Sequence, residues 1–217
     1  MIDANEVADR VAHVRSLITD AGGTDVSLIA VTKSFGVEAI HAAFMAGCDA
    51  VGENYAQELA DKVALGLPSI DVHFIGALQS NKVRRVADHV ALWQSVDRTS
   101  VIDELAKRSP GAAILIQVDT TGEPSKGGVA PPELESMRSY ADTRGLRVAG
   151  LMTIGPTDGS VSECEKSFVL LRRLVSEHGL TVCSMGMTND FKIAVACGST
   201  MVRVGSGLFG ARPTALL

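Results

Sequence analysis

Aromatic side chains are scarce in this sequence of 217 residues, of which they make up 4%. The core is therefore expected to be built mainly from aliphatic side chains. Basic residues form no run and the formal net charge is -5, which excludes the basic footprint of a nucleic-acid-binding protein and a polybasic membrane patch. Neither nucleic acid nor a membrane is expected as a partner.

Cysteine is also rare, and its spacing excludes two classes of site. The sequence shows no CxxC pair, no Cys/His spacing of a metal centre and no disulfide framework of a secreted protein. The first twenty residues lack the basic and apolar regions of a signal peptide, and no apolar segment reaches membrane-spanning length. We therefore expect a cytoplasmic protein. The four cysteines are Cys48, Cys164, Cys183 and Cys197.

What the sequence does contain is a regular alternation of helical and apolar strand patterns. Apolar residues make up 46% and charged residues 21%, and the length suits one large core, so residues 1–217 are expected to form a single domain. A first helix through Val7 and Ile18 is ended by Gly22. Strands are predicted at 27–32, 49–51, 72–75, 92–96, 112–118, 146–152, 181–185 and 201–204. Helices are predicted at 37–47, 56–65, 81–89, 99–108, 132–144, 162–178 and 190–197.

Eight strands alternating with helices indicate an α/β fold, a single (β/α)8 TIM-type barrel with an extra N-terminal helix. Most strands are near-continuous apolar runs, as a parallel sheet covered on both faces requires. A doubly wound open sheet is the alternative, but it usually carries a glycine-rich turn after its first strand, where this chain has Thr32, Lys33 and Ser34. The longest polar interruption, 122–132, is expected to be a loop.

Lys33 stands at the end of the first apolar strand, where barrel active sites lie. Desolvation beside an apolar core can lower the pKa of a lysine until its neutral amine acts as a nucleophile and forms a Schiff base. The alternative is a lysine that extends from the strand end to water without chemical function.

The ends of strands seven and eight suit a phosphate group. Barrels often bind phosphate there through backbone N–H groups and a helix N-terminus, and Gly205, Ser206 and Gly207 let backbone amides approach an anion closely. Thr188 offers a hydroxyl at the start of the next helix. In the alternative interpretation, Thr188 or Asn189 is a plain helix N-cap and the glycines form a tight turn.

Arg203 lies within the last apolar strand, on the same face as Met201 and Gly205 by alternation. A permanently charged guanidinium in such a place needs a partner. One interpretation is a buried salt bridge, and the other is contact with a bound ligand from beneath. The carboxylates considered for the salt bridge are Glu53, Asp97 and Asp119.

Six segments together resemble the pyridoxal phosphate homeostasis protein family, the stand-alone barrel relatives of the N-terminal domain of alanine racemase. They are AVTK, GENYAQE, HFIGALQSNK, GLMTI, SMGMTND and GSTMVRVGSGLFGAR, and the resemblance extends from Ile29 to Arg212. It implies a fold-type III protein in which Lys33 holds pyridoxal 5'-phosphate as an internal aldimine. It further implies cofactor contacts for Asn54 in the pocket wall, Thr188 at the phosphate, Arg203 at the pyridine nitrogen, and Gly205 and Ser206 in the phosphate-binding turn.

The resemblance also bears on activity. A guanidinium beside the ring nitrogen disfavours its protonation and so weakens the ring as an electron sink for a carbanion. Racemase relatives use a tyrosine base from a separate β-domain, whereas this chain ends at Leu217 and contains only Tyr55 and Tyr140. We therefore expect a monomeric protein that buffers pyridoxal phosphate or delivers it to apo-enzymes, without substantial catalysis. The alternatives are a small amino-acid racemase and a phosphate-binding barrel without pyridoxal.

Two stretches depart from the family pattern or extend it. The family often has a second lysine and a proline after the aldimine lysine, where this chain has Ser34, Phe35 and Gly36. The stretch 123–128 resembles the family's ENSKSG segment and would place Lys126 near the mouth of the barrel. Lys126 is either a transient acceptor of the cofactor or a solvated loop lysine.

Overall fold

The computed structural model describes residues 2–211, so that Arg212, where the family resemblance ends, lies outside the described part. All eight strands pair in parallel and in sequence order, and β1 pairs with β8, which closes the sheet into a barrel. The predicted barrel is confirmed, and the open doubly wound sheet is wrong. The strands are β1 (Ser27–Val31), β2 (Ala50–Glu53), β3 (Asp71–Phe74), β4 (Leu92–Val96), β5 (Ala113–Gln117), β6 (Arg147–Met152), β7 (Val182–Met187) and β8 (Met201–Val204).

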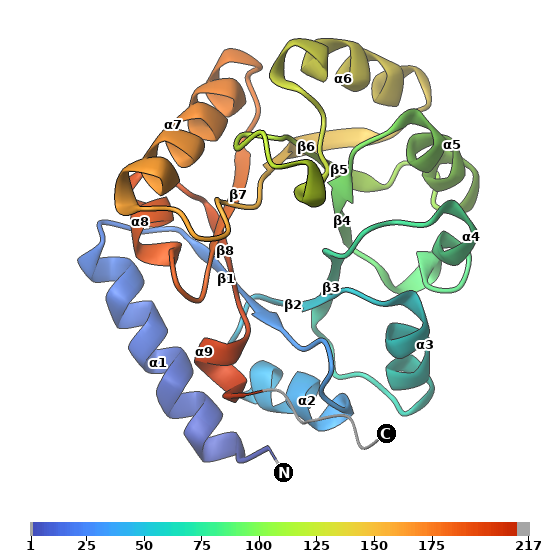
Figure 1. Ribbon diagram of the computed structural model, residues 1–217. Helices are drawn as coiled ribbons and strands as arrows, with labels where there is room; N and C mark the ends of the chain where they lie inside the picture. Colours follow the sequence, from blue (N-terminus) through green and yellow to red (C-terminus); the bar gives the residue numbers. More distant parts are fainter. Residues whose placement is uncertain (1, 212–217) are drawn as a thin grey trace.

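Helices form a ring around the strands, as Figure 1 shows in a view along the barrel. Within residues 2–211, no helix combines the length and the apolar character needed to cross a bilayer. The α-helices are α1 (Ala4–Asp20), α2 (Val37–Met45), α3 (Ala56–Ala64), α4 (Ser80–Val83), α5 (Thr99–Arg108), α6 (Leu134–Thr143), α7 (Val161–Glu177), α8 (Phe191–Ala196) and α9 (Ser206–Phe209). The 3-10 helices are η1 (Ala87–His89), η2 (Pro124–Lys126) and η3 (Pro131–Glu133).

The extra N-terminal helix is confirmed as α1. Its carboxylate N-cap, Asp3, accepts the backbone N–H groups of Asn5 and Glu6, which satisfies two donors at the helix start. Its buried stripe, which includes Val7 and Ile18, packs across α2, α8 and α9. Helix α1 therefore covers the seam where the first and last strands of the barrel meet (Figure 1).

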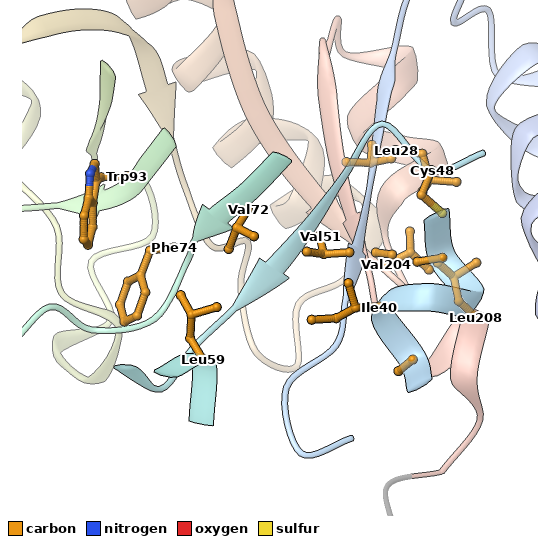
Figure 2. Close-up of a cluster of buried hydrophobic side chains, with 14 of the residues drawn as sticks. Leu28, Ile40, Cys48, Val51, Leu59, Val72, Phe74, Trp93, Val204 and Leu208 are labelled. Atoms are coloured by element: carbon orange, nitrogen blue, oxygen red, sulfur yellow. The ribbon is translucent and has the colours of Figure 1, made fainter. Parts of the chain in front are cut away.

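Two apolar layers result from the alternation of side chains along each strand. In β1, Leu28 and Ala30 point outward into the layer between strands and helices, whereas Ile29 points into the barrel interior with Met201 and Leu115. Figure 2 shows the outer layer, where side chains of β1, β2, β3 and β8 meet those of α2 and α3. This layer is mostly aliphatic, as expected, with an aromatic pair of Phe74 and Trp93 whose ring centroids are 5.6 Å apart.

One predicted helix is wrong as a continuous element. The segment 81–89 divides into α4 and η1, and its turns are closed by bonds between residues three apart, such as Val86 N–H to Val83 O at 3.1 Å. Val83 and Val86 are both fully buried, and a spacing of three residues keeps two side chains on one side of a 3-10 turn. The interval of three between the buried valines thus favours the tighter turn.

The other differences lie near the mouth of the barrel. The predicted loop 122–132 contains η2 and the first two residues of η3, and the segment after β8, where no helix is predicted, forms α9. Strand β7 extends two residues beyond its predicted end, to Met187. Its register against β8 shifts between Ser184 and Met187, where Gly186 has a φ of 94°. A glycine in this conformation accommodates an extra residue in the strand, which is a β-bulge.

Candidate functional site

A cavity of about 530 Å³ opens at the carboxyl ends of the strands, within the size range of small-molecule sites. Residues at or after the ends of β1, β3, β6, β7 and β8 form its wall, together with Lys126 from η2 and residues from α7 and α8. Five of the six predicted site residues line it. They are Lys33, Thr188, Arg203, Gly205 and Ser206.

Lys33 is half-buried in this wall. It follows Ile29 and Val31 at intervals of two, and those residues point into the barrel interior and into the cavity. The alternation of β1 therefore continues into the turn and directs the lysine to the cavity.

A buried cluster of charges holds the turn that carries Lys33 from both sides. Lys62 Nζ donates to Thr32 O at 2.9 Å, to Glu53 Oε1 at 2.6 Å and to Glu58 Oε1 at 2.6 Å. Glu58 Oε1 in turn accepts the Ser34 backbone N–H at 2.7 Å. Ser34 has a φ of 67°, a conformation that costs a non-glycine residue about 1 kcal/mol and persists only where contacts hold it.

Sequence reasoning missed this cluster. Glu58 and Lys62 are four residues apart in α3, a spacing that brings opposite charges together on a helix. That spacing is visible in the sequence, but it also occurs on solvated helix faces. Only the fold shows that Lys62 is 3% exposed and turned toward the Lys33 turn.

Thr188 lies where the ends of β7 and β8 meet, brought there by the bulge in β7. Its Oγ1 accepts the backbone N–H groups of Gly205 at 3.3 Å and Gly207 at 3.4 Å, and lies 3.4 Å from Ser206 Oγ. Three donors thus converge on one oxygen, as they would on an oxygen of an anion. The interpretation of Thr188 or Asn189 as a plain N-cap is wrong, because Asp190 occupies the N-cap position of α8.

Gly207 contributes to this convergence through its lack of a side chain. A Cβ atom there would lie 2.9 Å from Val204 Cγ1 and 3.2 Å from Thr188 Cγ2. A side chain at position 207 would therefore force Val204 or Thr188 to shift, and the glycine lets the backbone approach Thr188 without that displacement. We refer below to Thr188, Gly205, Ser206 and Gly207 as the anion cradle.

Arg203 points inward from β8 and is 4% exposed. Its Nη1 donates to Ser184 Oγ at 2.6 Å and its Nη2 to Thr153 O at 2.8 Å. Burial lowers the pKa of Arg203 to about 10, against the opposing attraction of Asp190, so the guanidinium stays charged at neutral pH.

The predicted alternative of a buried salt bridge for Arg203 is wrong. Among residues 2–211, no carboxylate forms an ion pair with this guanidinium, and its two bonds go to neutral oxygens. The three candidate carboxylates have other partners: Glu53 pairs with Lys62, Asp97 pairs with Arg98, and Asp119 accepts the backbone N–H groups of Thr121 and Gly122.

Asn54 is the predicted site residue that the cavity wall does not include. It is half-buried after the end of β2, and its backbone lies against Gly76. Its Oδ1 is buried, and within the described part of the chain it has no hydrogen-bond partner. A contact of Asn54 with a ligand stays a prediction.

Lys126 lines the same cavity as Lys33. Its Nζ donates to Glu123 Oε1 at 2.8 Å and to Gly155 O, and its side chain is 10% exposed. The interpretation of Lys126 as a solvated loop lysine is therefore wrong. The lysine and its carboxylate partner attach the 122–132 segment to the loop after β6.

The charges of the wall favour an anionic ligand. Three of its charged side chains are cationic, Lys33, Lys126 and Arg203, and one is anionic, Asp190. This local excess of positive charge contrasts with the net charge of -5 of the whole chain. A concave wall with such an excess concentrates anions from solution.

Comparison with known proteins agrees with this geometry. The chain matches the family model "Alanine racemase, N-terminal domain" over residues 2–213. It is 38% identical over 204 residues to the pyridoxal phosphate homeostasis protein of Haemophilus influenzae, covering 86% of this chain and 85% of that protein.

Solved structures give the same result. PipY of Synechococcus elongatus, solved with PLP bound, is 32% identical and superposes with a TM-score of 0.84, covering 94% of this chain and 100% of PipY. Alanine racemase from Bacillus anthracis is 18% identical with a TM-score of 0.74, covering 99% of this chain and 58% of the racemase, and shares the fold. The resemblance indicated by the six sequence segments is thereby confirmed. The chain belongs to the alanine racemase N-terminal domain family and, within it, to the pyridoxal phosphate homeostasis proteins.

Proposed function

We propose that this chain binds pyridoxal 5'-phosphate in the described cavity and serves in the homeostasis of that cofactor, as its relatives' name states. The observation that carries the proposal is the convergence of three different groups on one cavity. Lys33 supplies an amine, the anion cradle supplies N–H and O–H donors, and Arg203 supplies a buried cation.

These groups fit the three polar ends of the cofactor. The anion cradle suits its phosphate, because backbone N–H groups bind phosphate without a counter-charge. The aldehyde supplies an electrophilic carbon, with which Lys33 Nζ would form an imine bond as the aldehyde oxygen leaves as water. Arg203 would donate to the ring nitrogen, as the family resemblance implies, because a guanidinium carries donors only.

We further propose that the protein has no substantial catalytic activity. A second acid or base beside the cofactor is needed for racemisation, and neither tyrosine lines the cavity. Tyr55 is 57% exposed, and the Tyr140 hydroxyl donates to Asp103 at 2.8 Å on the outer helices. The remaining amine, Lys126, is held by Glu123 and by Gly155 O.

The binding proposal is tested by absorption spectroscopy of the purified protein after incubation with pyridoxal phosphate and removal of free cofactor. We expect a visible band distinct from that of the free cofactor, and covalent fixation of the cofactor on Lys33 after borohydride reduction, located by peptide mass spectrometry. Lys33→Ala should lose the band, whereas Lys107→Ala, an exposed lysine in α5, should keep it. Retention of the band by Lys33→Ala would overturn the assignment.

The absence of catalysis is tested separately with the loaded protein. L-alanine and a panel of other amino acids are incubated with it, and the D-isomers are measured by chiral chromatography. We expect no racemisation above the rate with free pyridoxal phosphate. A rate well above that level, lost in Lys33→Ala, would establish the racemase alternative instead.

Three finer properties belong to the same proposal. Residues 1–217 act as one functional domain. The protein is a monomer, which is supported by the scattered placement of exposed large apolar side chains within residues 2–211, apart from the adjacent Phe44 and Met45. The protein is cytoplasmic, which its four free cysteines support. It passes the cofactor to apo-enzymes that require pyridoxal phosphate. Light scattering tests the monomeric state. Direct mixing of the loaded protein with an apo-enzyme that requires pyridoxal phosphate, followed by an assay of that enzyme, tests the transfer of the cofactor.

A further inference from the structure

A hydrogen-bonded network of buried polar side chains, called the polar network below, extends from Arg203 across the barrel interior. Ser184 Oγ, which accepts from Arg203 Nη1, donates to Gln94 Oε1 at 2.7 Å, and Gln94 Nε2 lies 2.9 Å from His73 Nδ1. The four residues come from β8, β7, β4 and β3. Each of them is between 0% and 7% exposed. Polar groups at this depth are costly unless they are paired, so their arrangement is fixed.

The direction of every hydrogen bond between these four side chains follows from Arg203. A guanidinium only donates, so Ser184 Oγ must accept from it and directs its single hydrogen to Gln94 Oε1. The amide oxygen of Gln94 is thereby assigned to Ser184, and its NH2 group donates to His73 Nδ1. His73 must therefore be neutral, with its proton on Nε2. Burial lowers the pKa of His73 to about 4, against the opposing charge of Asp71, which agrees with this assignment.

Apart from Arg203, every member of the polar network is neutral. Ser184, Gln94 and His73 carry no charge at neutral pH, and Thr153 offers only a backbone oxygen to the guanidinium. The full positive charge of Arg203 is therefore not cancelled by a partner beneath it. Its two bonds use two of its five N–H donors, while the residue itself lines the cavity.

We propose that Ser184, Gln94 and His73 are positioning residues, which hold Arg203 so that it presents its charge and a remaining N–H donor to a neutral acceptor atom of the ligand. On the proposed function, on which this inference rests, that acceptor is the unprotonated ring nitrogen of pyridoxal phosphate. Held in this way, the charge of Arg203 disfavours protonation of the ring nitrogen and so weakens the ring as an electron sink.

The test measures the preference of the protein for a ring nitrogen. Dissociation constants are determined at pH 7.5 for pyridoxal phosphate and for its carbocyclic analogue, in which a C–H group replaces the ring nitrogen. Both ligands carry the same aldehyde and phosphate, and their intrinsic difference in imine formation is the same for every variant, so the change in the ratio between variants reports the ring contact. We expect the wild type to prefer pyridoxal phosphate at least about tenfold, since a hydrogen bond to a charged donor is lost with the analogue.

Two variants interrupt the polar network at different positions. If one of them fails to fold, the other still tests the proposal. Ser184→Ala and Gln94→Leu should reduce the preference to about threefold or less, because Arg203 loses one of its two bonds in the first variant and Ser184 loses its own acceptor in the second. The matched control is Ser199→Ala. Ser199 is also a buried serine, 4% exposed, but its Oγ donates to Met185 O at 2.8 Å and contacts no member of the polar network. This control should keep the full preference.

The outcomes separate the two proposals. Binding of neither ligand by the wild type would overturn the proposed function and this inference with it. Equal binding of both ligands by the wild type would overturn the inference and leave pyridoxal phosphate binding intact. If both variants keep the full preference for pyridoxal phosphate, or if Ser199→Ala loses it to the same extent, the polar network is ordinary core structure and the inference is overturned.

Discussion

Burial favours the neutral form of His73 inside this barrel. His73 is 7% exposed, and a charged imidazole at that depth would lose its hydration. Its one bond within the described chain, from Gln94, also requires the neutral form. Folding therefore lowers the affinity of His73 for a proton, which links the stability of the protein to pH.

We predict that His73 makes the protein less stable in mild acid. In the unfolded chain the imidazole takes up a proton below pH 6.5, whereas the folded pKa is about 4. Between these two values the unfolded state binds more protons, so stability falls as the pH falls, by about 3 kcal/mol over the whole interval. Urea unfolding at pH 7 and pH 4.5 measures the loss.

The variant His73→Asn isolates this contribution. Asparagine cannot be protonated in this range and keeps an acceptor for Gln94, so its unfolding free energy should fall by roughly 2–3 kcal/mol less than that of the wild type over the same interval. Identical pH profiles for the two proteins would contradict the assignment of a neutral buried imidazole.

Among single residues, those at strand ends could be predicted from the sequence and those inside the barrel could not. Lys33, Thr188 and Arg203 stand out because each interrupts or follows an apolar run. Gln94 and Ser184 point inward from strands whose outward side chains are also buried, so the alternation of polar and apolar residues that marks a half-exposed strand is not visible. Their contacts depend on the closure of the barrel.

At the scale of elements, the same reasoning explains which boundaries could be predicted. The predicted and observed bounds of β4, α5 and β8 are identical, because each is a clear apolar or amphipathic pattern with turn residues on both sides. The division of the 81–89 segment and the bulge in β7 could not be predicted. Both depend on contacts made in the folded state, the burial of Val83 and Val86 in one case and the pairing with β8 in the other.

Helix α3 fixes the Lys33 turn through Lys62, and we predict that Lys62→Met destabilises the protein by about 3 kcal/mol or more at pH 7. The substitution leaves the fully buried carboxylate of Glu53, whose Oε2 already has no partner in the described structure, without its cation. Because burial raises the pKa of Glu53, protonation of this carboxyl should recover part of the loss at pH 5. Urea unfolding of the variant at both pH values measures this.

Two further variants test the cause of that loss. Glu53→Gln combined with Lys62→Met removes the stranded charge and should recover more than half of the stability. Arg108→Met removes a pair of the same helical spacing, with Glu104 at 3.0 Å, in which the arginine is 39% exposed. This control should cost less than about 1 kcal/mol. A cost for Lys62→Met as small as that of Arg108→Met would mean that the buried cluster does not hold the turn.

At the scale of the whole molecule, the cavity joins elements that are distant in the sequence. Its wall includes Lys33 after β1 and Ser206 after β8, and these two strands pair to close the barrel. A ligand that contacts both ends of the chain binds the closed barrel and not the unfolded chain. Ligand binding and the cooperative unfolding of the barrel are therefore linked.

We predict that pyridoxal phosphate at a hundred times its dissociation constant raises the unfolding midpoint by roughly 5–10 °C. This concentration adds about 2.7 kcal/mol, and a chain of this length gains about 2–4 °C for each kcal/mol. Pyridoxal at the same concentration should give a much smaller rise, because it has no phosphate for the anion cradle. In Gly207→Ala the added Cβ presses on Thr188 and Val204, so pyridoxal and its phosphate should raise the unfolding midpoint by nearly the same amount. Each rise is measured from the midpoint of the same protein without ligand. Differential scanning calorimetry decides the matter: equal shifts with pyridoxal and its phosphate in the wild type would place the phosphate outside the cradle.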